Sequence, residues 1–189
     1  MGYAYWSLKR LDHLRHVLYE GMIGTTEMME MLRQESCGIR QGLLEARTPS
    51  DKHRMSTLLI LVLLKRKDAA PTLQWHQTRN IGPAQNRRAN WRYIPRGGGR
   101  KAFGYTKQCL RKYAASDEEL ELMWEIEQQA APLRLAMAHC QRILELIDSL
   151  EKAMMDANFI DESEISTFNK SEYLEALYNG APIQITWDE

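Results

Sequence analysis

The stretch SDEELELMWEIEQQAAPLRLAMAHCQRILELI, Ser116 to Ile147, decides the fold class. Ser116 followed by Glu119 fits a capping box, in which a hydroxyl and a carboxylate bond the first free amides of a helix. Acidic residues at 117–121 complement the positive end of the helix dipole. The stretch therefore predicts a long helix over 116–158. Pro132 is expected to kink it or divide it in two, because proline lacks an amide donor and crowds the preceding turn.

The second half of this helix carries a regular apolar seam. Its residues follow the 4-3-4-3 spacing of a and d positions over about two heptads. They are Leu133, Met137, Cys140, Leu144 and Ile147. Such a seam needs a partner helix. The favoured partner is the N-terminal part of the same chain, and the alternative is a helix of another molecule in a coiled coil.

Apolar residues also recur at helical spacing near the start of the chain. Leu8, Leu11, Leu14, Val17 and Leu18 predict a helix over 5–20 that Gly21 and Gly24 interrupt. Thr25 or Thr26 is expected to cap a second helix, which runs to about Arg47 and ends before Pro49. The sequence therefore predicts an N-terminal helical pair.

The middle of the chain has a different pattern. Short segments rich in Trp, Tyr, Thr and Ile, Thr72 to Arg79 and Ala89 to Pro95, predict an antiparallel pair of strands. The apolar run Leu58 to Leu64 fits either a buried helix or a third strand, since periodicity does not separate the two. Strand alternation places Trp91, Tyr93 and Pro95 on one face, and Arg92, Ile94 and Arg96 on the other.

These patterns predict a mainly helical α+β protein in which long helices carry a small basic antiparallel hairpin or three-stranded sheet. The expected organisation has four segments: an N-terminal helical segment over 1–50, a basic β-containing segment over 51–115, a long helix over 116–158 that packs on the N-terminal helices, and an acidic tail over 159–189. Its composition, 44% hydrophobic and 26% charged, is that of an ordinary globular chain.

The formal net charge of zero hides a strong segregation of charge. Residues 1–68 carry 11 basic and 8 acidic residues, residues 69–116 carry 10 basic and none acidic, and residues 117–189 carry 4 basic and 17 acidic. A field of one sign on one segment attracts polyanions whatever the total charge is. The middle segment is therefore a candidate binding surface.

Three cysteines at unrelated spacings, Cys37, Cys109 and Cys140, favour a reduced, cytoplasmic protein, as does the absence of a secretory leader pattern. The longest apolar run is too short to span a bilayer, so no contact with a membrane is expected.

Motifs for catalysis and metal binding are weak. Gly97 to Lys101 lacks the spacing of a phosphate-binding loop, and we interpret it as a hairpin tip. His139 and Cys140 are adjacent, whereas two metal ligands on one helical face stand three or four residues apart. The acidic residues at 117–127 are interpreted as a solvated helix face. We expect no enzymatic activity, no catalytic residue, no metal and no cofactor.

Nucleic-acid binding fits the basic segment better. Arginine outnumbers lysine seven to three there, which suits bidentate contacts to phosphate or guanine. Trp75, Trp91, Tyr93, Phe103 and Tyr105 are candidates to stack on bases, although Trp75 and Trp91 are more simply the core under a sheet. The predicted nucleic-acid-binding residues are Arg79, Arg87, Arg88, Trp91, Arg92, Tyr93, Arg96, Arg100, Lys101, Lys107, Arg111 and Lys112. The competing interpretation is that the basic segment docks on the acidic C-terminal third.

The order of motifs resembles a known family. A Trp-bearing strand (LQWHQTR, 73–79), a basic strand and glycine turn (WRYIPRGGGRKAFGYT, 91–106) and a helix with a Leu-Arg pair (123–147) are similar to the MobI-type auxiliary mobilization proteins of conjugative elements. The matching positions are Trp75, Arg79, Arg92, Ile94, Gly97, Tyr105, Trp124, Glu125, Glu127 and Arg134.

This resemblance implies a non-enzymatic accessory protein that helps a relaxase act at the origin of transfer. The expected partners are DNA, duplex DNA in preference to other forms, and a relaxase or other mobile-element proteins. The chain could also form a homodimer. The alternative function is a protein adaptor or inhibitor of a mobile element that uses the apolar seam and the segregated charge.

Overall fold

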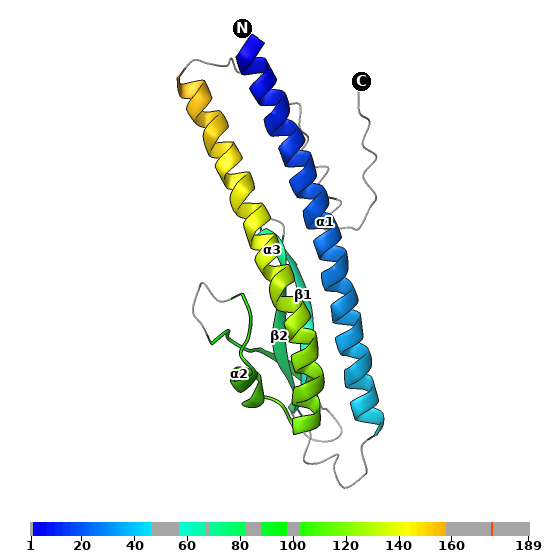
Figure 1. Ribbon diagram of the computed structural model, residues 1–189. Coiled ribbons are helices and arrows are strands. Elements are labelled where there is room, and N and C mark those ends of the chain that lie inside the picture. Colours follow the sequence, from blue (N-terminus) through cyan, green and yellow to red (C-terminus); the bar gives the residue numbers. More distant parts are fainter. Residues whose placement is uncertain are drawn as a thin grey trace. The chain divides into compact units, whose positions relative to one another are not determined.

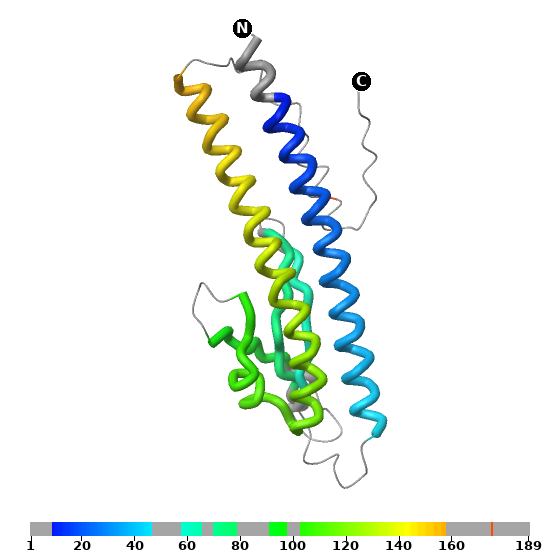
Figure 2. The backbone as a smooth tube through the Cα atoms, viewed as in Figure 1, coloured from blue at the N-terminus to red at the C-terminus, as the bar shows by residue number. Residues whose placement is uncertain are grey.

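The computed structural model describes residues 2–46, 57–66, 69–81, 88–97, 103–157 and 175 (Figure 1). Side chains are described for residues 9–46, 58–65, 70–78, 91–97, 103–157 and 175 (Figure 2). The elements are α1 (Gly2–Glu45), β1 (Thr57–Arg66), β2 (Ala69–Ile81), β3 (Arg88–Tyr93), α2 (Lys107–Arg111) and α3 (Asp117–Asp156) (Figure 1). The predicted class, a mainly helical α+β protein with a small antiparallel sheet, is confirmed. None of the described helices combines the length and the apolar character needed to cross a membrane.

The chain divides into two compact units. Unit 1 consists of residues 1–26, 65–70 and 136–189, and unit 2 of residues 27–64 and 71–135. Helices α1 and α3 each contribute one part to each unit. The sheet residues that carry candidate function lie in unit 2.

Helix α1 is continuous, so the predicted N-terminal helical pair is wrong. The hydroxyls of Thr25 and Thr26 donate to the carbonyl oxygens of Gly21 and Met22, 2.7 and 2.8 Å away, inside the helix. Both threonines therefore bond back to the preceding turn and cap nothing. Burial of Met22 and Thr26 on one face offsets the roughly 1 kcal/mol that each glycine costs a helix.

The sheet has the strand order β1-β2-β3. Strands β2 and β3 pair antiparallel in a register that runs from His76 opposite Tyr93 to Ile81 opposite Arg88, which confirms the predicted pair. The ambiguous segment 57–66 is a strand and completes a three-stranded sheet. Four consecutive residues, Leu58 to Leu61, are buried, so β1 is covered on both faces and shows no alternation in its sequence.

Helix α3 covers one face of this sheet in unit 2. On β2 the alternate residues Leu73, Trp75 and Gln77 are buried, and the Trp75 indole donates to Glu127 of α3. Ile94 follows β3, donates its amide to the Trp75 carbonyl oxygen at 2.9 Å and is buried as well. Trp91 and Tyr93 are exposed on the other face, so the predicted alternation along this strand is confirmed for these residues.

Helix α3 begins after Ser116, which caps it as predicted, while the Glu119 carboxylate reaches the amide of the residue before the cap. The Ser116 hydroxyl accepts from the amide of Glu119 at 3.1 Å, and the Glu119 carboxylate accepts from the amide of Ala115 at 2.6 Å. The helix then runs without interruption through Pro132, so the predicted division is wrong. Pro132 is exposed, and so is Gln128, whose carbonyl lacks a donor at this turn. Water can satisfy that carbonyl, which makes a proline tolerable there.

In unit 1 the start of α1 lies beside the end of α3, so the two helices are antiparallel there (Figure 1). The buried Arg15 donates to Asp148 at 3.0 Å and to Glu151. Burial opposes a charged guanidinium, yet these two carboxylates outweigh it and raise the pKa of Arg15. Arg15 therefore fixes the position of α1 relative to α3 along the helix axes in this unit.

The apolar seam of α3 is mostly buried. Met137, Leu144 and Ile147 are buried, while Leu133 and Cys140 are half-buried. Burial raises the pKa of the Cys140 thiol. Among the described side chains of α1 in the same unit, those of Leu18, Tyr19 and Met22 are buried and apolar.

Candidate nucleic-acid interface

The predicted nucleic-acid-binding residues lie on β2, β3, the segment after β3, and α2. Arg79 is on β2 opposite Asn90, and Arg88 is on β3 opposite Ile81. Lys107 and Arg111 belong to α2, and Lys112 is its C-cap. Arg87, Arg100 and Lys101 lie outside the described residues.

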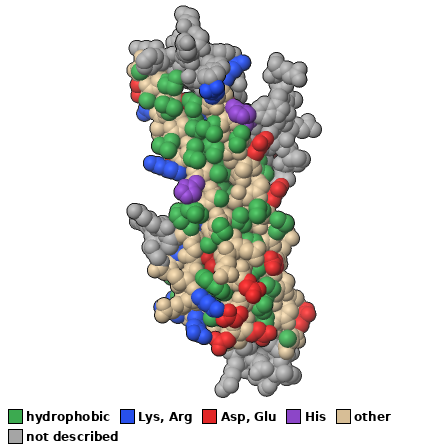
Figure 3. Space-filling model, viewed as in Figure 1, with side chains coloured by type: hydrophobic (Ala, Val, Ile, Leu, Met, Phe, Trp, Pro, Cys, Tyr) green, Lys and Arg blue, Asp and Glu red, His purple; other side chains and the backbone are tan. Residues whose placement is uncertain are grey.

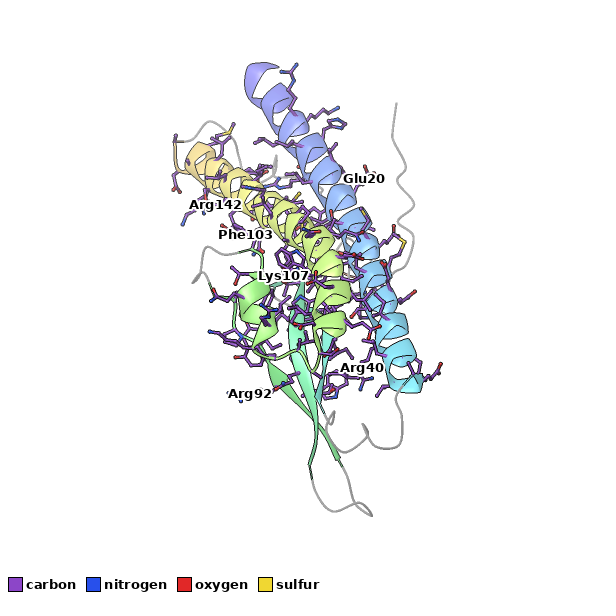
Figure 4. All side chains as sticks on the ribbon, turned by 60° about the horizontal axis from the view of Figure 1, so that its bottom comes forward. Glu20, Arg40, Arg92, Phe103, Lys107 and Arg142 are labelled. Carbon is purple, nitrogen blue, oxygen red and sulfur yellow. The ribbon has the colours of Figure 1, made fainter. Side chains whose placement is uncertain are left out.

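Strand β3 presents its side chains in two directions. Trp91 and Tyr93 are 53% and 43% exposed on the sheet face that carries His76 and Thr78. Arg92 points to the opposite face and is also exposed, and β3 is an edge strand of the sheet that the described strands form (Figure 4). The strand therefore offers aromatic rings on one side and a guanidinium on the other.

Arg96 has a structural role in addition to its charge. One guanidinium nitrogen lies 3.3 Å from the Thr72 hydroxyl, and the guanidinium carbon is 5.8 Å from the centre of the Tyr105 ring. Such cation–π contacts stabilise the charged group where it is. Arg96 is thus held against β2 and Tyr105.

Two other basic residues contact the acidic start of α3. Lys107, which is labelled in Figure 4, pairs with Glu121, and Arg111 pairs with Asp117 at 3.1 Å. All four side chains are well exposed, and exposed pairs of this kind contribute about 0–1 kcal/mol. Two basic residues of this segment therefore contact the acidic start of α3 through exposed ion pairs. Within the part of the chain that the structure describes, Arg92 and Lys112 form no ion pair.

The aromatic residues separate into core and surface. Trp75 is fully buried, as the core interpretation predicts, but the same interpretation is wrong for Trp91, which is exposed. Trp91 follows the alternation of the edge strand and lies on the face opposite Ile94. Tyr105 is buried and unable to stack on a base, and burial raises its pKa to about 12. Phe103 is half-buried.

A buried ion pair joins the sheet to α3 in unit 2. Arg134 donates to both carboxylate oxygens of Glu127, at 2.9 and 2.7 Å, and both side chains are 1% exposed. The Trp75 indole and the Tyr105 amide each donate to Glu127 at 2.7 Å. Arg134 also donates to the carbonyl oxygens of Leu73 and Phe103, at 2.9 and 2.8 Å.

This cluster leaves no oxygen of Glu127 available to a ligand. Each carboxylate oxygen accepts two hydrogen bonds, and the Arg134 guanidinium lies 5.3 Å from the centre of the Tyr105 ring. A buried pair of charges is stable only when its remaining donors and acceptors are satisfied, as they are here. The cluster therefore holds β2, residues 103–105 and α3 together.

A second buried carboxylate on α3 lies eight residues earlier. Glu119 is 1% exposed and accepts from the Leu59 amide of β1 at 2.6 Å in addition to Ala115. The interpretation of the acidic residues at 117–127 as a solvated face is thus wrong for Glu119 and Glu127. Both face the sheet, where backbone and side-chain donors offset the cost of burial.

The described residues hold no group of three or more His, Cys, Asp or Glu that could bind a metal ion. Cys37, Cys109 and Cys140 are free thiols.

The comparison with protein-family models adds an independent finding. Residues 39–148, more than half of the chain, match the model described as MobI protein. The chain belongs to the MobI family. Neither the curated proteins nor the solved structures contain a significant match.

The MobI match confirms the resemblance seen in the motifs and identifies a mobilization protein. Four of the matching positions, Trp75, Tyr105, Glu127 and Arg134, meet in the buried cluster. Three exposed or half-buried positions, Arg92, Trp124 and Glu125, lie outside that cluster. In this MobI protein much of the motif pattern therefore belongs to the fold, whereas Arg92 on β3 is exposed.

Proposed function

We propose that the protein is a non-enzymatic DNA-binding accessory protein of conjugative transfer that helps a relaxase act at the origin of transfer. Membership of the MobI family supports the process. One observation supports DNA as the ligand: exposed Trp91 and Tyr93 share the edge strand β3 with exposed Arg92, inside a segment of ten basic and no acidic residues.

Strand β3 is an edge of the sheet, so its exposed side chains can approach duplex DNA, and arginine is the side chain that most often contacts guanine in the major groove. Arg79 and Arg88 lie on the paired part of β2 and β3. Arg92 and Lys112 supply positive charge that no described carboxylate neutralises.

Removal of Arg92 provides the most direct test. Arg92→Ala deletes an exposed charge without touching the buried cluster, so the fold should be retained. Affinity for a duplex carrying the origin of transfer should fall, and the slope of log affinity against log salt should decrease by about 0.9 for each lost phosphate contact. Filter binding or fluorescence anisotropy at several salt concentrations measures both.

Lys152→Ala is the matched control, since Lys152 is an exposed cation on α3 far along the chain from β3. It should leave affinity and salt slope unchanged. Equal effects of the two substitutions would mean that β3 makes no specific contact. Arg96→Ala is less informative, because Arg96 also contacts Thr72 and Tyr105.

The contribution to relaxase action is tested separately. Nicking of supercoiled DNA at the origin by the relaxase should increase when the wild-type protein is added. Arg92→Ala should reduce that increase in proportion to its loss of DNA binding. An unchanged increase would assign the effect to a contact with the relaxase itself, as the adaptor alternative requires.

A further inference from the structure

Unit 1 exposes a set of large apolar side chains on both of its helices. On α1, Leu14 and Val17 are 40% and 48% exposed. On α3, Ile143, Leu146 and Leu150 are 39%, 54% and 49% exposed. Figure 3 shows hydrophobic side chains gathered along the α1 and α3 part of one face. Contiguous exposed apolar surface of this kind marks a binding site for another protein surface.

These residues form a second stripe beside the buried seam of each helix. On α1, Leu14 and Val17 each precede a buried residue by one position, Arg15 and Leu18, and Gly21 likewise precedes Met22. The stripe continues at Gly24. Its positions 14, 17, 21 and 24 have the 3-4-3 spacing with which helices pack against one another.

Helix α3 repeats the arrangement. Ile143 and Leu146 each precede a buried residue by one position, Leu144 and Ile147, and Leu150 continues the spacing. The two helices are antiparallel in this unit, and on each the exposed stripe is displaced from the buried seam in the same rotational sense. In an antiparallel pair equal displacements bring both stripes to the same side. The two stripes, residues 14, 17, 21 and 24 with residues 143, 146 and 150, therefore form one face, which we call the outer face.

The outer face has large side chains opposite small ones. Arg15 contacts Asp148 and Glu151, which sets the level of the two helices. With a rise of about 1.5 Å per residue, Gly21 then lies level with Ile143 across the pair. A Cβ added at Gly21 or at Gly24 would meet nothing within 4 Å, so both positions are open depressions. The protruding Ile143 side chain on α3 and the depression at Gly21 on α1 thus lie at the same level along the helix axes.

This arrangement fits a second copy of the same unit. If two copies face each other about a two-fold axis parallel to the helices, α1 of one copy lies against α3 of the other. Ile143 then enters the depression at Gly21, and Leu146 and Leu150 meet Val17 and Leu14. Each copy supplies both the protruding side chains of α3 and the depression on α1.

Charge at the rim is complementary in the same arrangement. Glu20 lies on α1 just beyond the stripe, and Arg142 lies on α3 just beyond the other stripe (Figure 4). Among the residues that the structure describes, Arg142 pairs with the exposed Glu145, three residues further along its own helix. About the two-fold axis, Glu20 of each copy comes opposite Arg142 of the other, which gives two pairs of opposite charge.

We infer that the outer face is a homodimer interface, in which two copies of unit 1 form an antiparallel four-helix bundle. In such a bundle each pair of helices keeps its own buried seam and buries its outer face against the other pair. The inference goes beyond the proposed function and is independent of it, because no residue of β3 takes part.

Sedimentation equilibrium of the full chain over a range of concentrations tests the interface. Wild type should associate to twice its mass of 22.0 kDa. Gly21→Leu should weaken the dimer at least tenfold by filling the depression, while leaving the monomer folded, because leucine favours a helix more than glycine does. Circular dichroism checks that the helix content is retained.

Charge reversal identifies the partner as a second copy. Glu20→Arg and Arg142→Glu should each weaken the dimer, and the double variant should restore it, since every pair is then reversed. Lys152→Glu, on the side of α3 turned away from the outer face, is the control and should leave the dimer unchanged. A wild type that stays monomeric at every concentration overturns the inference, as does a double variant no stronger than either single one.

Discussion

The Glu127 carboxylate shows how one side chain can connect three parts of a fold. It accepts from β2, from residue 105 and from Arg134 of its own helix, and it is almost fully buried. Removing one partner of a buried ion pair leaves the other charge uncompensated, which costs far more than the pair itself contributes.

Glu127→Gln should therefore lower the free energy of unfolding by about 3–5 kcal/mol, because Arg134 stays buried without a counter-charge. Urea denaturation followed by circular dichroism measures the change. Glu125→Gln is the matched control, since Glu125 is exposed two residues earlier on the same helix. It should change the free energy by less than about 0.5 kcal/mol. A similar loss in both variants would contradict the role assigned to the cluster.

His76 is predicted to make stability depend on pH. Burial lowers its pKa from 6.5, neither ring nitrogen finds a hydrogen-bond partner among the described residues, and the ring meets Tyr93 edge-on with the ring centres 5.8 Å apart. The unfolded chain then binds more protons than the folded protein between the lowered pKa and pH 6.5. The free energy of unfolding should fall as the pH drops below about 6.5.

Denaturant titrations at several pH values measure this fall. His76→Phe should remove part of it, because phenylalanine keeps a ring against Tyr93 and has no proton to bind. An unchanged slope in His76→Phe would assign the acid sensitivity to other groups.

At the scale of elements, glycines in this chain have opposite roles. A Cβ at Gly38, on the surface of α1, would meet nothing within 4 Å. A Cβ at Gly104 would lie 3.1 Å from the Ala131 Cβ and 3.4 Å from a Glu127 oxygen. Gly38 occupies a helix position where a residue with higher helix propensity would fit. Gly104 allows a connecting segment to approach α3 closely.

Gly38→Ala should raise the free energy of unfolding by about 0.5–1 kcal/mol, since alanine loses less backbone entropy in a helix. Gly104→Ala should lower it, because the methyl group crowds Ala131 and the buried carboxylate. Thermal unfolding of the two variants beside wild type compares them directly. Equal shifts of the melting temperature would show that the close approach at Gly104 relaxes without cost.

The elements that sequence predicts well are those with local causes. The start of α3 follows from Ser116 and Glu119, and the β2–β3 pair follows from two short segments rich in aromatic and β-branched residues. Continuity of α1 through Gly21 was not predictable from propensity, because packing on one face overrides it. Burial of Glu119 and Glu127 depends on donors far away in sequence, at Leu59 and Trp75, which no local pattern reveals.

The parts of the candidate interface that depend on local sequence patterns were predictable, and the parts that depend on long-range contacts were not. Charge segregation singled out the β3 region, and alternation separated Trp91 and Tyr93 from Arg92. The family positions Glu127 and Arg134 could be recognised as a pattern, yet only the fold shows that they bind each other. The pairing of Lys107 and Arg111 with α3 likewise depends on where α2 lies.

At the scale of the whole molecule, opposite charges stand on different segments of one chain. Residues 158–189 carry seven acidic residues and one basic residue, against ten basic and no acidic residues in 69–116. Linked charges of opposite sign compete with an external polyanion for the same cations.

A chain that ends at residue 157 should therefore bind duplex DNA more tightly than the full chain at low salt. The difference should shrink as salt screens the competing charges, and fluorescence anisotropy over a salt series measures both trends. Replacing the seven acidic residues of 158–189 by their amides should reproduce the effect. Identical affinities of all three proteins at low salt would show that the acidic segment does not compete with DNA.

The hydrogen bond from the Leu59 amide to Glu119 affects how the protein behaves in a crowded solution. β1 forms one border of the sheet, and a strand from a neighbouring molecule would need its outward amides in order to extend the sheet. A carboxylate already occupies one of them. Strand addition at this border would have to displace Glu119 from the Leu59 amide, whereas strand addition beside β3 would compete with the ligand that the DNA-binding proposal assigns to that edge.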